Sequence, residues 1–371
     1  MTGQDFPALH IVEEGMREGM QIESAAIPAA AKVRLLDALS ATGLREIVVG
    51  SFVRADWVPQ MRDVEDLIRQ MTAVPGVAYT ALVLNEKGAA RRQAFSPPLT
   101  IDPVPRLTVH ACDVFAQRNT NRSVTDEIAG WPAIISRAAR AGARTATARV
   151  NAAFGSNFSG DIDPSVPLAL LDRMITAWAQ AGIEAEAVWL GDPMGWNTPL
   201  AVEHLLGEVT RRWPGVRRVH LHLHDQRGAA LVSAYQAIRT LPASMTLTID
   251  TAIGGVGGCP YCGNGRAAGM IATEDLVDMA EEMGVPTGID RDRLIAASVL
   301  AEEVFGHPLY GKLALAGPRP RGARRYPADM PLVETLEQAS HFRRGPAVYE
   351  GQLRPWRRPI SAAAQPPARS R

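Results

Sequence analysis

The stretch EAVWLGDPMGWNTPLAVEHLLGEVTRRWPGVRRVHLHLHD, residues 186–225, decides the fold class of this chain. It begins with a short apolar run (186–192), continues with apolar residues at helical spacing (201–213), and ends with a second β-branched and apolar run (217–225). A strand, a helix and a strand in this order form a βαβ unit, whose two strands lie parallel in one sheet. The stretch therefore predicts an α/β protein with a parallel sheet.

The same alternation extends over most of the chain. The expected strands cover residues 9–15, 45–52, 77–84, 106–111, 144–150, 186–192, 217–225 and 245–254. Helical patterns cover residues 29–43, 167–182, 201–213, 228–241 and 272–284. Eight strand–helix pairs are the number in a (β/α)8 TIM barrel. An open doubly wound sheet is the alternative, but residues 13–21, EEGMREGMQ, lack the G-x-G-x-x-G turn that often follows its first strand.

The pattern changes after about residue 285, which suggests three parts. We expect a catalytic barrel over residues 8–285 and a C-terminal helix with an extension over residues 286–330, packing on the barrel. A tail over residues 331–371 is expected to be partly disordered, because its last residues, PWRRPISAAAQPPARSR, are rich in Pro, Ala and Arg.

Composition excludes several classes of protein. The 371 residues carry a formal net charge of zero, so we expect no nucleic-acid partner. No apolar run is long enough for a membrane helix, and the N-terminus lacks the pattern of a signal peptide. The three cysteines, Cys112, Cys259 and Cys262, do not form a disulfide framework, so the cytoplasm is the expected compartment. We also expect a homo-oligomer that binds a small molecule.

The seventh expected strand ends in a histidine pair. Side chains two residues apart on a strand share a face, so His222 and His224 should point together into the barrel mouth. Imidazoles placed in this way are typical metal ligands, although a structural histidine pair is the alternative. His220 lies deeper in the strand and is expected to be structural.

Two other strand ends carry charged side chains at the same end of the barrel. Strand 1 leads to Arg17 and Glu18, which can supply a fixed positive charge for an oxyanion and a carboxylate ligand, or simply form a loop salt bridge. Strand 6 ends at Asp192, for which a helix N-cap is an equally good reading.

Strand 8 runs into a glycine-rich loop, GGVGGCPYCGNG (254–265). Such loops often act as lids over barrel sites. The Cys259-Pro-Tyr-Cys262 pair also matches a thiol–disulfide redox motif, but that motif belongs after an early strand of a small domain. A zinc knuckle would need further Cys or His residues nearby, and the sequence has none.

In combination these motifs resemble one known family. Residues 15–23, GMREGMQIE, resemble the G-P-R-D-G-L-Q-N-E opening of 3-hydroxy-3-methylglutaryl-CoA lyases, which belong to the metal-dependent lyase and Claisen-condensing barrels (pyruvate carboxyltransferase-type domains). Further similar segments, in family order between about residues 11 and 312, are SFV (51–53) with WVPQM (57–61), FAQRNTNRS (115–123), LGD (190–192) with TP (198–199), HLHD (222–225), GGVGGCPY (254–261) and ATEDL (272–276).

The resemblance implies roles for individual residues of this chain. The implied metal ligands are Glu18, His222, His224 and, in place of the family's lid asparagine, Asn264. The implied catalytic residues are Arg17 for the enolate oxygen, Asp192 for proton transfer and Cys259 as the lid cysteine near the reacting carbon. The implied substrate-binding residues are Gln21, Ser51 and Asn119. The cofactor would be Mg²⁺ or Mn²⁺, although two imidazoles also accept Zn²⁺, Co²⁺ or Fe²⁺.

The implied chemistry agrees with the residues present. Retro-aldol or retro-Claisen cleavage generates an enolate, whose charge must be stabilised by a lysine imine or by a metal. None of the three lysines, Lys32, Lys87 and Lys312, ends an expected strand, so the metal route is favoured. We therefore expect a metal-dependent carbon–carbon lyase that acts on a branched hydroxy acid or its CoA thioester.

Three departures from the family pattern point to an altered substrate. Glu18 stands where the family has Asp, Val48 where the lyases carry a Glu, and Met270 where they have a ligating Asn. Two alternatives remain. A condensing acyltransferase of the 2-alkylmalate type would usually show His-x-His-Asn-Asp, whereas here Asp225 follows His224 directly. A barrel that binds a ligand without turnover is the other.

Overall fold

The computed structural model describes residues 5–258 and 269–354. Two compact units make up the chain, Met1–Gly311 and Lys312–Arg371. All eight long strands lie in the first unit. They are β1 (Ala8–Glu13), β2 (Glu46–Ser51), β3 (Ala78–Leu82), β4 (Arg106–His110), β5 (Thr145–Asn151), β8 (Glu184–Asp192), β9 (Arg218–Leu223) and β10 (Thr246–Thr251).

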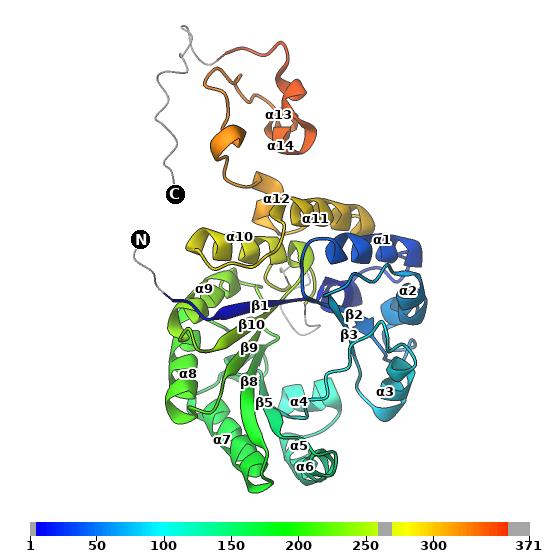
Figure 1. The fold of residues 1–371 in the computed structure, drawn as a ribbon, viewed down its shortest axis with the longest axis vertical. Helices are drawn as coiled ribbons and strands as arrows, with labels where there is room; N and C mark the ends of the chain where they lie inside the picture. Colours follow the sequence, from blue (N-terminus) through cyan, green and yellow to red (C-terminus); the bar gives the residue numbers. More distant parts are fainter. Residues whose placement is uncertain (1–4, 259–268, 355–371) are drawn as a thin grey trace. The chain divides into compact units, whose positions relative to one another are not determined.

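These strands form one parallel sheet in the order β3-β2-β1-β10-β9-β8-β5-β4. The first strand pairs with the last, from Ala8 opposite Thr246 to Glu13 opposite Thr251, which is the pairing that closes a barrel. The ladder is interrupted between β3 and β4. Figure 1 shows the strands arranged in an open ring, with the helices outside. The expected α/β barrel is confirmed, and each of the eight expected strands is present.

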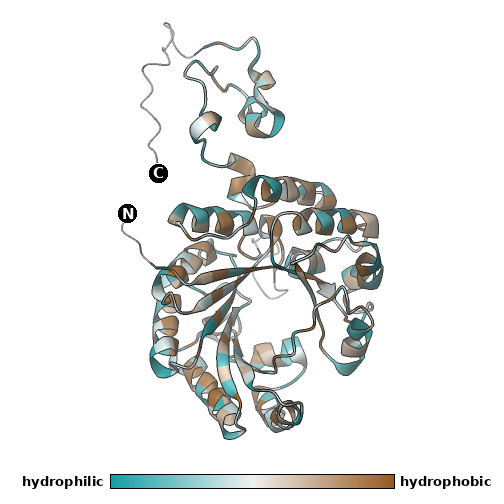
Figure 2. Ribbon diagram, in the orientation of Figure 1, coloured by the Kyte–Doolittle hydropathy of each residue, from teal (hydrophilic) through white to brown (hydrophobic). Residues whose placement is uncertain are grey.

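The helices of the first unit surround the sheet. They are α1 (Ala29–Ser40), α2 (Val64–Gln70), α3 (Glu86–Gln93), α4 (Asp113–Thr120), α5 (Val124–Ala129), α6 (Trp131–Arg140), α7 (Ser165–Gln180), α8 (Pro199–Arg212), α9 (Ala230–Thr240), α10 (Thr273–Met283) and α11 (Arg291–Phe305). Hydrophobic and hydrophilic residues alternate along them (Figure 2), as expected for helices with one buried face. In α8, for example, Val202, Leu205, Leu206 and Val209 are buried.

The alternation within β9 explains how the sheet faces both the helices and the site. Val219, Leu221 and Leu223 are fully buried in the hydrophobic core. His220 and His222, between them, both bond to Asp250 of β10 and therefore lie on the inner face of the barrel. The sequence Val-His-Leu-His-Leu thus places apolar residues against the helices and imidazoles inside.

Local departures from the expected pattern lie mainly at the C-terminal ends of the strands. Strand β1 ends at Glu13 because the next residues form a π-helical turn, Gly15–Gly19. Three helices instead of one separate β4 from β5, and a short hairpin of β6 (Gly155–Ser156) and β7 (Gly160–Asp161) follows β5. Helix α11 packs on α1 and α10.

The second unit contains short helices, α12 (Lys312–Ala316), α13 (Leu336–Ala339) and α14 (His341–Arg344). The expected disordered end of the tail lies outside the described residues. Within the described part of the chain, no helix combines the length and the apolar character needed to cross a lipid bilayer.

Candidate metal centre and active site

The π-helical turn after β1 carries the first functional side chains. Its two glycines lie against other parts of the site: a Cβ at Gly15 would come 2.5 Å from Glu13 Oε1, and one at Gly19 would collide with Val256. This close packing fixes the turn against the loop that follows β10. Arg17 and Glu18, between the glycines, are therefore held at the barrel mouth.

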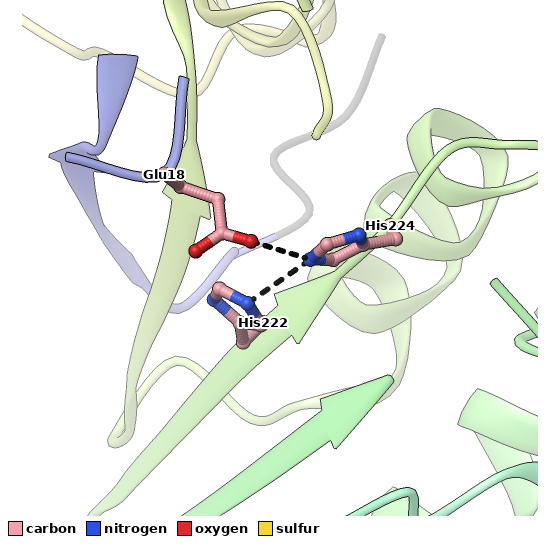
Figure 3. A group of neighbouring side chains, drawn as sticks. All are labelled: Glu18, His222 and His224. Carbon is pink, nitrogen blue, oxygen red and sulfur yellow. Dashed lines mark hydrogen bonds and ion pairs between the residues drawn. The ribbon is translucent and has the colours of Figure 1, made fainter. Parts of the chain in front are cut away.

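Glu18, His222 and His224 form a compact cluster at this mouth. The Nε2 atoms of the two imidazoles are 3.2 Å apart, and Glu18 Oε1 lies 3.6 Å from His224 Nε2. Figure 3 shows the carboxylate of the β1 turn pointing toward the two rings of β9 and its end. One donor atom from each residue lies within 4.8 Å of the others. Two imidazoles and a carboxylate at such distances are a donor set for a divalent metal.

Asp250 sets the orientation of the first imidazole. Its Oδ2 accepts a hydrogen bond of 2.8 Å from His222 Nδ1, which leaves the lone pair of Nε2 directed into the cluster. Burial alone lowers the pKa of His222, but the bond to Asp250 and its charge outweigh this and raise it. The other oxygen of Asp250 bonds to His220 Nε2 at 2.5 Å. Despite burial, the two imidazoles hold the pKa of Asp250 well below its usual range.

The second imidazole is paired with Gln226, whose side-chain nitrogen lies 3.0 Å from His224 Nδ1. The Oε1 atom of the same amide is buried and has no hydrogen-bond donor among the described residues. Exchanging the two amide atoms places Oε1 against His224 Nδ1–H. His224 Nε2 then carries a lone pair, as a metal ligand requires. The residues present therefore fit a divalent ion.

Arg17 lies between two carboxylates. It forms a two-point ion pair with Glu14, with Nε 2.7 Å from Oε2 and Nη2 2.8 Å from Oε1, and its Nη1 bonds to Glu18. Burial opposes the charge on Arg17, but Glu14 and Glu18 raise its pKa. Burial likewise raises the pKa of Glu18, but Arg17, His224 and His222 together lower it. Glu18 is therefore ionised, as a metal ligand must be.

The comparisons with known proteins agree with this site. The family model for HMGL-like proteins matches residues 8–300. The chain belongs to the HMGL-like family. It is 32% identical to the mitochondrial hydroxymethylglutaryl-CoA lyase of Gallus gallus over 292 residues, 78% of this chain and 91% of that protein. It is also 32% identical to the hydroxymethylglutaryl-CoA lyase YngG of Bacillus subtilis, over 81% of this chain and 94% of that one.

Solved structures give the same result for this HMGL-like chain. An HMG-CoA lyase from Acinetobacter baumannii, in complex with coenzyme A and 3-methylmalate, superposes with a TM-score of 0.70 at 30% identity, covering 88% of this chain and 99% of that one. The chain is thus a carbon–carbon lyase of the hydroxymethylglutaryl-CoA lyase type, in a metal-dependent family. The three lysines lie on helices α1, α3 and α12 rather than on barrel strands, in keeping with a reaction that does not use an imine.

Asp192 lies at the end of β8 and is fully buried. Its Oδ1 accepts from the backbone of Trp196 at 2.9 Å, and its Oδ2 accepts from the backbone and side chain of Asn197 at 2.6 and 2.7 Å. Burial raises its pKa, and these hydrogen bonds only partly offset that effect. The N-cap of α8 is Thr198, so Asp192 anchors the preceding loop instead of capping the helix.

The other residues implied by the resemblance have different surroundings. Ser51, at the end of β2, is buried, and its hydroxyl has no hydrogen-bond partner among the described residues. Asn119, near the end of α4, is exposed and places Nδ2 3.2 Å from His110 Nε2. Gln21 is half-buried just after the π-helical turn. The lid residues Cys259 and Asn264 lie outside the described residues.

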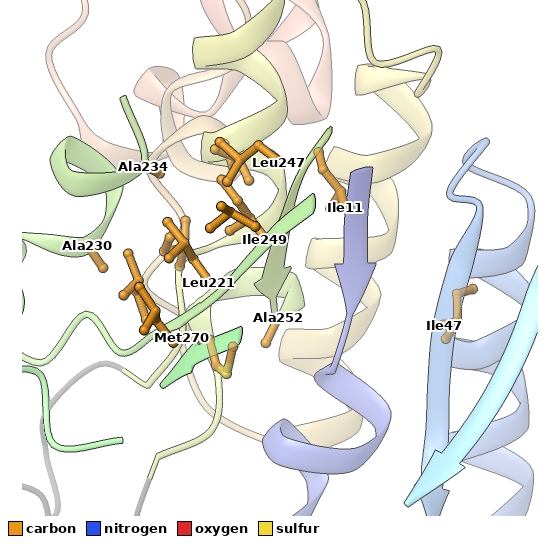
Figure 4. Packing of buried hydrophobic residues seen from close by; sticks show 14 of the residues in the cluster. Ile11, Ile47, Leu221, Ala230, Ala234, Leu247, Ile249, Ala252 and Met270 are labelled. Atoms are coloured by element: carbon orange, nitrogen blue, oxygen red, sulfur yellow. The ribbon is translucent and has the colours of Figure 1, made fainter. Parts of the chain in front are cut away.

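Two of the three substituted family positions are apolar and buried. Val48 lies on β2 and is 7% exposed. Met270 belongs to the hydrophobic cluster that also includes Leu221 and Ala252 (Figure 4). Its backbone pairs with His224 in an isolated antiparallel bridge. Met270 therefore supports the second imidazole through the backbone and leaves the ligand set to other residues.

Three residues of the site were missed from the sequence. Asp250 is the one acidic residue in an otherwise apolar and hydroxyl-bearing strand, MTLTIDT (245–251), and its position two residues from Thr248 on the inner face was a usable signal. Glu14 and Gln226 carry no such signal, because their partners Arg17 and His224 are identified only by the folded geometry.

Proposed function

We propose that this chain cleaves a branched 3-hydroxy acid, as its CoA thioester, with a divalent cation held by Glu18, His222 and His224. The observation that carries the proposal is the cluster of their donor atoms at the barrel mouth, with Asp250 and Gln226 behind the imidazoles. The thioester is extended to this chain from the Acinetobacter baumannii lyase that was solved with coenzyme A. We propose Mg²⁺ or Mn²⁺ as the cation, and Zn²⁺, Co²⁺ or Fe²⁺ as ions that the imidazoles also accept.

The bound cation would supply Lewis-acid polarisation of the substrate oxygens and a lower pKa for the hydroxyl group. The chain's own residues account for the remaining steps. Arg17, fixed by Glu14, presents a positive charge where the enolate oxygen develops. Asp192, whose pKa is raised by burial, is the proposed carrier of the hydroxyl proton. Breaking the carbon–carbon bond releases a carbonyl product and the enolate of the thioester, which takes up a proton.

The metal assignment is tested by elemental analysis of the purified protein. We expect about one divalent ion per chain, and none in the double variant His222→Ala/His224→Ala. His204 is an exposed histidine on α8, so His204→Ala is the matched control and should keep the ion. Unchanged metal content in the double variant would refute the assignment.

The substrate is tested by assaying the metal-loaded protein with a panel of 3-hydroxyacyl-CoA thioesters. Val48 and Met270 replace polar family residues, and an unpaired polar substrate group costs about 1 to 3 kcal/mol. We therefore expect little or no acetoacetate from 3-hydroxy-3-methylglutaryl-CoA and faster cleavage of a thioester with a different substituent. Turnover of 3-hydroxy-3-methylglutaryl-CoA above about 1 per second would contradict an altered substrate.

A further inference from the structure

A buried histidine–glutamate pair lies near the metal centre but outside it. His110 Nδ1 bonds to Glu127 Oε1 at 2.8 Å, and the backbone N–H of His110 donates to Glu127 Oε2 at 3.0 Å. The side chains are only 2% and 8% exposed. Thr120 also donates to Glu127, at 3.1 Å. Three hydrogen bonds therefore hold the Glu127 carboxylate in place, and one of them orients the imidazole of His110.

Strand register places His110 in the same layer of the barrel as His222, one of the proposed metal ligands. His110 is opposite Asn151 of β5, and Gly191 of β8 is opposite His222 of β9. Val150 pairs with Leu190, so the residues that follow them, Asn151 and Gly191, are also neighbours. A Cβ on Gly191 would come 2.6 Å from Asn151 Oδ1. The row His110–Asn151–Gly191–His222 thus runs across four adjacent strands.

The hydrogen bonds around His110 determine which amide atoms face it. Since the Glu127 carboxylate takes Nδ1–H, Nε2 of His110 is an acceptor. Two amide nitrogens approach it, Asn119 Nδ2 at 3.2 Å and Asn151 Nδ2 at 3.3 Å. Asn151 Oδ1 accepts from the backbone of Ala152 at 3.0 Å. Asn119 Oδ1 has no donor among the described residues, although Asn119 is exposed at the end of α4.

We propose that the Glu127–His110 pair is a positioning device that holds Asn119 with its Oδ1 directed to substrate, so that Asn119 accepts a hydrogen bond from an O–H or N–H group of the acyl thioester. This proposal rests on the proposed function of the site. Without the imidazole, the amide of Asn119 would rotate freely between two orientations and present its donors as often as its acceptor. The pair thereby selects a substrate with a donor group at this position.

The test is a double-mutant cycle on substrate binding and turnover. The variants are His110→Phe, which keeps the ring volume without nitrogens, Asn119→Ala, and the two combined. We expect each single variant to raise the Kd for 3-hydroxybutyryl-CoA, measured by calorimetry on the metal-loaded protein, by about 5- to 100-fold. The combined variant should be no worse than Asn119→Ala alone, because His110 acts through Asn119.

Two further measurements separate positioning from a structural role. His110→Gln keeps one donor and one acceptor and should retain most of the affinity for 3-hydroxybutyryl-CoA. The metal content should be unchanged in all variants. On the best substrate of the panel, KM should rise with little change in kcat. Additive losses in the combined variant, or a Kd in His110→Phe equal to that of an exposed control, His204→Phe, would overturn the proposal.

The calorimetry also distinguishes this proposal from the proposed function. If the wild-type protein binds the thioester but cleaves none of the panel, the proposed function fails and the binding cycle still decides the role of His110. If the wild-type protein does not bind 3-hydroxybutyryl-CoA, the positioning of Asn119 toward an acyl thioester is refuted.

Discussion

Two sets of buried carboxylates lie at the mouth of this barrel, and their surroundings differ. Glu18 and Asp250 lie beside Arg17 and the imidazoles, whereas the hydrogen bonds to Glu13 and Glu274 within the described part of the chain come from hydroxyl and backbone N–H donors. Burial acts to raise the pKa of all four. Arg17 and the imidazoles reverse the effect for Glu18, and His220 and His222 reverse it for Asp250, but the pKa values of Glu13 and Glu274 are both raised to about 7.

The difference distinguishes carboxylates that can take part in the reaction from carboxylates that hold the backbone in place. Ionised carboxylates at Glu18 and Asp250 are available to a metal ion and to its imidazole ligands. Glu13 instead bonds to the backbone N–H groups of Gly15 and Ile253, and Glu274 to that of Gly254. Glu13 therefore joins the β1 turn to the loop after β10, and Glu274 joins that loop to α10 and, through Ser298, to α11. In this barrel, the charges and hydrogen bonds of Arg17 and the imidazoles lower the pKa of their carboxylate neighbours, whereas hydroxyl and backbone N–H donors leave those of Glu13 and Glu274 raised.

Arg17→Gln breaks the charged set most directly and should have the largest effect. It removes the positive charge between Glu14 and Glu18 and the proposed stabiliser of the enolate. We expect kcat to fall by about 10²-fold or more, the scale seen when an oxyanion donor is lost. Steady-state kinetics on the best substrate measures this effect. A variant that folds, keeps its metal and retains near-normal kcat would show that Arg17 has no role in the transition state.

Asp250→Asn should have the next largest effect. The amide is nearly isosteric, but it cannot hold both His220 and His222 as the carboxylate does. Loss of a carboxylate behind a metal-binding imidazole typically lowers metal affinity by about 10- to 100-fold. Competition with a chelator measures this affinity. Asp172→Asn, at an exposed position on α7, is the matched control, and equal affinities of the two variants would contradict the role of Asp250.

Glu274→Gln tests the second set of carboxylates, those with raised pKa values, and should have the smallest effect. Because the folded pKa is about 7 and the unfolded value is 4.5, the native state binds more protons between these pH values. The stability contributed by this group is therefore present below pH 4.5 and falls as pH rises through about 7. The shift corresponds to about 3 kcal/mol at most. Glu274→Gln should reduce the loss of stability between pH 5 and pH 8.

Urea unfolding at the two pH values provides the measurement. Glu303 is an exposed glutamate on α11, so Glu303→Gln should keep the pH dependence of the wild type. If Glu274→Gln behaves like this control, Glu274 is ionised in the native state, and the contrast between the two sets of carboxylates does not hold.

The two imidazoles proposed as metal ligands could be predicted to lie together, because His222 is in β9 and His224 follows directly after its end. His222 and His224 are two residues apart, and strand geometry alone places them on one face. The residues that orient them could not be predicted in the same way. Asp250 and Gln226 come from the next strand and from a loop, and their contacts depend on strand register and on the path of the chain after β9.

The sequence by itself determined the number and order of the strands and the barrel that they form, because these follow from local hydrophobic periodicity. Only the tertiary structure decided that Glu14 neutralises Arg17, that Asp250 joins two histidines, and that Glu127 fixes His110. These contacts join residues on different elements or across a non-canonical turn. They arise from strand register and packing, which no local pattern in the chain encodes.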